Sequence, residues 1–151
     1  MSAAVFAFLH HAFAFLIVAT LMVELVVSKS ELTLTSARSL LRMDAVYGVS
    51  ALSIIIVGVL RVQYFEKGAH YYLHSMPFIV KMLLFAAVGL LSIYPTRTFM
   101  SWRANLRNDK IPVLDDATRR KVRIFIHLEL TLLFAMMLCA ALMARGIGYY
   151  S

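Results

Sequence analysis

The sequence lacks several features that soluble proteins commonly use for structure or catalysis. Its 151 residues include one cysteine, Cys139, so neither a disulfide within the chain nor a cluster of thiolate ligands can form. It has no phosphate-binding loop, no dinucleotide fingerprint and no Ser-His-Asp arrangement with a supporting spacing. Only eight residues are Asp or Glu. These absences argue against a disulfide-stabilised domain and against the common classes of soluble enzyme.

The sequence is instead rich in long apolar runs. Hydrophobic residues make up 62% of the chain, and the mean hydropathy is +0.80. Four runs, at residues 3–27, 43–62, 76–96 and 120–144, approach the ~20 residues that a helix needs to cross a ~30 Å hydrocarbon core. The first run is expected to span the membrane rather than act as a signal peptide, because no Lys or Arg precedes it. The sequence therefore predicts an all-α integral membrane protein: one antiparallel four-helix bundle in a single transmembrane domain, residues 1–151.

The basic residues lie mainly in the connections between these runs. The formal net charge is +7, and the largest group of Lys and Arg separates the third run from the fourth. By the positive-inside rule, the first and third connections are cytoplasmic and both termini lie on the outer side of the membrane. The basic surplus is thus a topology signal first and a contact with anionic lipid second, and it does not indicate nucleic acid. We expect Pro95 to end or kink the third span, and Asp115, Asp116 and Thr118 to cap the fourth.

Ionisable residues inside the membrane are costly unless partnered, so they are the first candidates for a functional site. Antiparallel threading sorts them into two layers. His10 and His127 are separated by roughly half of the ~30 Å core, so they are not expected to share a metal ion. The predicted outer layer contains His10, His11, Arg61 and Lys81, with His70, Tyr71, Tyr72 and His74 from the connection above. The predicted inner layer contains Glu24, Asp44, Arg97, His127 and Glu129.

The direction in which each side chain leaves its helix indicates which residues of the two layers can face the interior of the bundle. Glu24 falls ~40° from the face of His10, so both can point into the bundle while His11 turns away, although a rotation favouring His11 is equally compatible with the sequence. His127 and Glu129 lie ~200° apart, and we favour an interhelical hydrogen bond to Asp44 or Glu24 over a metal site there. Small residues such as Gly48 and Gly58 would allow close approach, either for helix packing or for a planar macrocycle. Alternatively, His10, His11 and Lys81 have no cofactor role: the two histidines would lie at the membrane interface, and the Lys81 ammonium would extend outward to the same interface.

Several motifs resemble a bacterial family of small membrane proteins of unknown function. More distantly, the layout is similar to HemJ-type protoporphyrinogen oxidases and CopD-like membrane proteins. In the HemJ type, a first-span histidine and a third-span lysine are associated with haem b, which here match His10 or His11 and Lys81, with Arg61 matching a basic residue that ends the second span. Phe78-Ile79-Val80 replaces the aromatic and histidine residues expected before the lysine, so the resemblance favours haem binding over porphyrinogen oxidation. The motifs are Leu9-His10-His11, Asp44-Ala45-Val46-Tyr47-Gly48, Gly58-Val59-Leu60-Arg61-Val62, Phe65-Glu66-Lys67-Gly68, Tyr71-Tyr72, Phe78-Ile79-Val80-Lys81-Met82, Leu91-Ser92-Ile93-Tyr94-Pro95-Thr96 and Trp102-Arg103.

The leading functional prediction is an inner-membrane haem b protein that transfers electrons or oxidises a small lipophilic or tetrapyrrole substrate. His10 or His11 would bind the iron, Lys81 or another histidine such as His74 would be the sixth ligand or a pocket base, and Arg61 would bind a propionate. A second haem site would use His127. A copper or small-molecule transporter without haem, built on the outer histidines and Lys81, is the alternative, and an assembly partner of a larger complex is a third. The sequence leaves open whether the protein is an enzyme and whether it forms a homo-oligomer. It also leaves open whether its partner is a quinone, a tetrapyrrole or an electron-transfer protein.

Overall fold

The computed structural model describes residues 1–65 and 68–150, with the side chain of Ala69 left aside. Glu66 and Lys67 of the quoted motifs lie outside the described residues. Four long helices dominate the described chain, joined by short helical segments. In chain order the elements are α1 (Ser2–Val27), α2 (Leu34–Leu60), the π-helical turn η1 (Arg61–Phe65), α3 (Ala69–Leu73), α4 (Met76–Ser101), α5 (Arg103–Arg107) and α6 (Asp116–Ala144).

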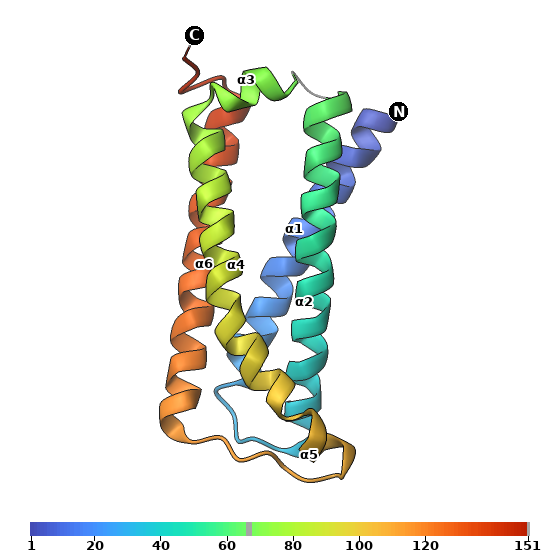
Figure 1. Ribbon diagram of the computed structural model, residues 1–151, viewed down its shortest axis with the longest axis vertical. Helices are drawn as coiled ribbons and strands as arrows, with labels where there is room; N and C mark the ends of the chain where they lie inside the picture. Colours follow the sequence, from blue (N-terminus) through green and yellow to red (C-terminus); the bar gives the residue numbers. More distant parts are fainter. Residues whose placement is uncertain (66–67, 151) are drawn as a thin grey trace.

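The four long helices run alternately up and down, and both termini lie at the same end of the molecule (Figure 1). Helix α1 packs along α2, α4 packs along α6, and the contacts of α1 with α6 and of α2 with α4 close the bundle. All four are long and apolar enough to cross a membrane. The predicted all-α membrane bundle is therefore confirmed.

The packed core lies toward the end that carries α5, which we call the α5 end. Leu21, Leu40, Phe99 and Ile126, one from each long helix, are all at most 1% exposed. Toward the other end, the α1/α2 pair and the α4/α6 pair diverge in Figure 1. Large apolar side chains cover the outside of the bundle, as expected for a surface in lipid. The tight packing of the α5 end thus joins two helix pairs that separate toward the termini.

The helix ends follow local capping chemistry. Thr33 starts α2 with a capping box, in which its hydroxyl accepts from the Ser36 N–H and its own N–H donates to the Ser36 hydroxyl. Asp115 caps α6 by accepting from the Thr118 N–H at 3.0 Å, as predicted. The hydrogen bonds from Thr118 hold the pKa of the Asp115 carboxyl below its usual range.

Of the two effects expected of Pro95, ending the third span is wrong, because α4 continues through Pro95 to Ser101. Pro95 is buried among neighbouring helices, a setting in which a membrane helix tolerates the loss of one internal hydrogen bond, and below it α4 leans toward α2 (Figure 1). Helix α2 begins at Leu34, so the helix extends beyond the span predicted for residues 43–62. Arg38 and Arg42, which precede that span, lie on this extension of the helix.

The C-terminal segment packs over α3 at the end that carries the termini. The Met76 N–H donates to the Gly148 carbonyl at 2.9 Å, and the Tyr150 N–H donates to the His74 carbonyl at 3.0 Å. Gly148 has a φ of +82°, and a Cβ there would lie 2.8 Å from Cδ of Pro77. Only glycine suits both constraints. This segment and α3 together form a cap over α4 and α6.

Candidate functional site

His10 points from α1 toward α2, where the absence of a side chain at Gly58 leaves room for its ring. A Cβ at Gly58 would lie 3.4 Å from Cε1 of His10, so the imidazole rests against the α2 backbone. The Nδ1 atom of His10 is buried and has no hydrogen-bond partner in the described part of the chain. An inward-facing imidazole with an unpaired ring nitrogen is thus built into the α1/α2 pair.

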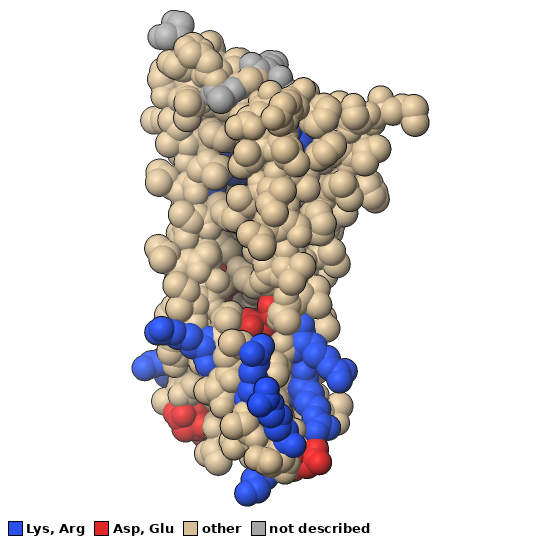
Figure 2. Space-filling view, turned by 45° about the vertical axis from the view of Figure 1, so that its right-hand side comes forward, with Lys and Arg blue, Asp and Glu red and all other residues tan. Residues whose placement is uncertain are grey.

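Two cationic side chains share this region with His10. Lys81, from the second turn of α4, and Arg61, where α2 passes into η1, both lie within electrostatic range of the His10 ring. Lys81 and Arg61 are also within such range of each other. In the upper part of Figure 2, blue atoms of Lys or Arg are visible, recessed between residues that are drawn in tan. We call this group, His10, Arg61 and Lys81, the His10 site; it draws on both helix pairs.

The other predicted outer histidines lie elsewhere. His11 is exposed, and its Nδ1 lies 2.6 Å from the Ala7 carbonyl oxygen of its own helix. His70 and His74 stack with ring centroids 4.3 Å apart, and Nδ1 of His74 lies 2.8 Å from the His70 carbonyl oxygen. The structure thus turns His10 rather than His11 inward. It assigns His74 to the cap at the chain end, where its ring lies 5.8 Å from that of Tyr150.

A second polar group lies in the tightly packed part of the bundle. Glu24 of α1, Asp44 of α2 and Glu129 of α6 are only 2%, 7% and 0% exposed. The Tyr47 hydroxyl donates to Oε2 of Glu129 at 3.0 Å, and the Thr96 hydroxyl of α4 donates to Oδ1 of Asp44 at 2.6 Å. The Glu24 carboxyl lies within electrostatic range of Asp44 and Glu129. These five residues, the carboxyl cluster, contribute polar groups from all four long helices.

The carboxyl cluster is incompletely paired. Oε1 of Glu24 and Oε1 of Glu129 are buried without a hydrogen-bond partner in the described residues. The expected partner of Glu129, Asp44 or Glu24, was wrong: the donor is Tyr47. A phenol supplies the proton for this bond, whereas two ionised carboxylates can only accept.

Other predicted members of the inner layer lie outside the cluster. His127 and Arg97 are exposed, as the ~200° separation of His127 from Glu129 predicts for the former. Gly48 also plays no part in close packing, because a Cβ there would meet no atom within 4 Å. Of the two glycines expected to allow close approach, only Gly58 does so.

We expect Tyr47→Phe to destabilise the protein by about 0.5–2 kcal/mol, because it removes the donor to Oε2 of Glu129 and leaves a buried acceptor unpaired. Unfolding by sodium dodecyl sulfate in mixed micelles measures this change. Tyr64→Phe is the matched control, since the Tyr64 side chain is 71% exposed. Equal stabilities for the two variants would contradict a structural role for the Tyr47 hydroxyl.

The four spans, the half-buried His10 site and the buried carboxyl cluster define a small polytopic α-helical membrane protein. Residues 2–148 match a family described as "Predicted membrane protein (DUF2214)", and the chain belongs to this family. No curated protein and no solved structure matches the chain significantly. The family description agrees with the membrane-spanning fold.

Proposed function

We propose that this protein binds haem b at the His10 site and serves as a redox protein of the bacterial inner membrane, with both termini periplasmic. The observation that carries the proposal is the inward-facing imidazole of His10, whose Nδ1 is unpaired, beside two cationic side chains. Imidazole is a common axial ligand of haem iron, and cationic side chains complement the two propionates. The donor set therefore fits haem b.

Each residue of the His10 site has a distinct part in this proposal. His10 would bind the iron, and Gly58 keeps one face of its ring free of a neighbouring side chain. The Lys81 ammonium makes no ion pair or hydrogen bond with the described residues, which leaves it available as a sixth ligand, a pocket base or a propionate partner. The Arg61 guanidinium suits a propionate because it can donate two parallel hydrogen bonds. The bound haem would supply the one-electron chemistry that these side chains lack.

The proposal involves a single haem. A second site would need His127, and the exposed position of this residue on α6 gives it no support. A copper or transport site would need several histidines acting together, yet His11 is exposed and the ring of His74 engages His70 and Tyr150. The contacts of the described residues therefore favour haem at the His10 site over both alternatives.

Titration of hemin into protein purified from haem-depleted cells tests the proposal. We expect a Soret band that saturates near one equivalent per chain, with the pyridine haemochrome assay giving the same stoichiometry. Saturation at two equivalents would contradict the single site and implicate His127. A spectrum identical to that of hemin in empty detergent micelles would overturn the proposal.

A further inference from the structure

An open pocket of about 340 Å³ lies at the α5 end, between α2 and α5. The pocket and the His10 site lie toward opposite ends of the bundle. Each helix contributes two arginines spaced by four residues, so that each pair lies on one face of its helix. The lining residues are Arg38, Leu41, Arg42, Arg103, Leu106 and Arg107.

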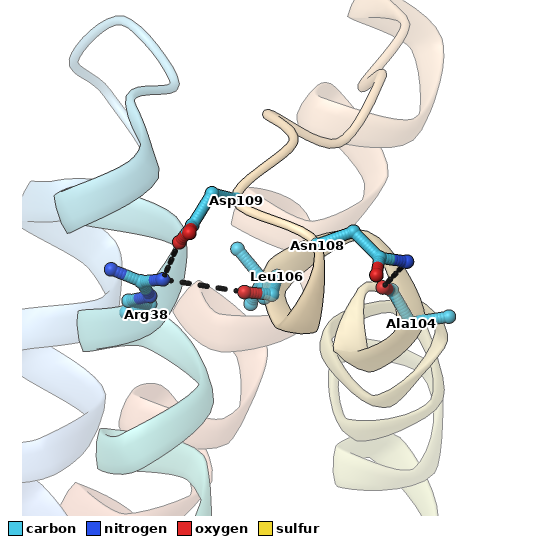
Figure 3. Close-up of polar contacts among 5 residues, drawn as sticks. All are labelled: Arg38, Ala104, Leu106, Asn108 and Asp109. Carbon is cyan, nitrogen blue, oxygen red and sulfur yellow. Dashed lines mark hydrogen bonds and ion pairs between the residues drawn. The ribbon is translucent and has the colours of Figure 1, made fainter.

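One of these arginines holds the pocket together. Nη2 of Arg38 donates to Oδ1 of Asp109 at 2.5 Å and to the Leu106 carbonyl at 3.3 Å (Figure 3). These bonds join the beginning of α2 to α5 and to the turn that follows it. Leu106 is only 6% exposed and anchors α5 in the core. The walls of the pocket are therefore held in place by packing and by the contacts of Arg38, whose charge is paired with that of Asp109.

The other three arginines give the pocket a net positive charge. Within the described part of the chain, the only ion pair is that of Arg38 with Asp109. Arg42, Arg103 and Arg107 are exposed and make no described hydrogen bond. Figure 2 shows Lys and Arg side chains gathered over the same end of the molecule, with few acidic ones. An anion entering the pocket would thus meet the guanidinium groups of Arg42 and Arg107, which have no ion-pair partner among the described residues. It would also meet that of Arg103, which lies within electrostatic range of the Asp44 carboxyl.

We propose that this pocket binds a phosphoryl anion, the group shared by anionic lipid headgroups and free phosphate. Guanidinium groups bind phosphate oxygens through paired, charge-assisted hydrogen bonds, and arginines on two helices can approach one phosphate from two directions. The side chains of Leu41 and Leu106 add apolar surface beside the arginines. The pocket also lies where the apolar core of the bundle ends, which is the level expected for lipid headgroups.

Native mass spectrometry of the detergent-purified protein with added phosphatidylglycerol tests this proposal. The pocket variant is Arg42→Gln/Arg107→Gln. The control is Arg120→Gln/Lys121→Gln, which removes the same charge from exposed positions on α6 outside the pocket. We expect the pocket variant to bind phosphatidylglycerol about 30-fold more weakly and the control less than about threefold more weakly.

Two further arms identify the source of the phosphoryl group and the specificity of the pocket. Displacement of the lipid by inorganic phosphate would support a phosphoryl site and assign it to the free anion, whereas failure to displace it would support a lipid site. Equal losses in the two variants would overturn the proposal, because diffuse surface charge would then explain the binding. Equally tight binding of zwitterionic phosphatidylcholine would also overturn it. Unchanged elution and unfolding of both variants would verify that the fold is intact.

Discussion

Replacing His10 with alanine is expected to abolish the Soret band of the purified protein, while replacing His11 with alanine leaves the band in place. The His10 ring faces the interior with an unpaired Nδ1, whereas the His11 ring is exposed and bonded to its own helix. Adjacent residues on a helix differ by ~100° in direction, so only one of the two can serve an interior site. Absorption spectra normalised to protein concentration measure the effect.

Chemical rescue separates a ligand role of His10 from a structural one. In His10→Gly, the deleted ring leaves space beside Gly58, and added imidazole should restore much of the Soret band. The same treatment of His11→Gly should change little. Retention of the full band in His10→Ala, or its loss only in His11→Ala, would contradict the assignment of His10 as the iron ligand.

Phe99→Ala is expected to be the most destabilising single truncation in the core, with a cost of about 3–5 kcal/mol. Phe99 is 1% exposed, and its ring lies 5.2 Å from that of Trp102 at the junction of α4 and α5. The truncation would open a cavity in the part of the bundle where all four helices meet. Lipid cannot refill such an interior cavity, so the lost contacts are not replaced.

Phe134→Ala is the matched control for this prediction, because the Phe134 side chain on α6 is 66% exposed. It should cost less than about 1 kcal/mol, since lipid replaces the contacts that are lost. Reversible unfolding in mixed micelles compares the two variants directly. Similar losses would mean that the tight packing is not concentrated at the α5 end.

The spans could be predicted because an apolar excess in a short chain leaves a helical membrane bundle as the only reasonable fold. The outer and inner layers of ionisable residues could be predicted from the alternating direction of the four spans, since the position of a residue along its helix sets its depth in the membrane. The choice between His10 and His11 could not be made in this way. It depends on how α1 rotates against α2, and thus on the space at Gly58, which is a property of the packed pair rather than of either helix.

The remaining features depend on tertiary contacts that single-helix reasoning does not reach. The roles of Tyr47 and Thr96 in the carboxyl cluster were not predicted, because a tyrosine or threonine in an apolar run is ordinary. One signal was present, since Tyr47 follows Asp44 by three residues and so shares its helix face. The arginine pocket had a similar signal, the i, i+4 spacing of Arg38 with Arg42 and of Arg103 with Arg107. Arg38 and Arg42 precede the span predicted for residues 43–62, and Arg103 and Arg107 follow the span predicted for residues 76–96, so the sequence alone placed neither pair on a helix.

The absorption spectrum of the protein purified from haem-sufficient cells, recorded before and after reduction with dithionite, is the most direct test of haem binding at the His10 site. We expect a Soret band that shifts on reduction, with α and β bands that sharpen in the reduced protein. A colourless preparation that is folded and elutes as a single species would contradict haem binding at the His10 site.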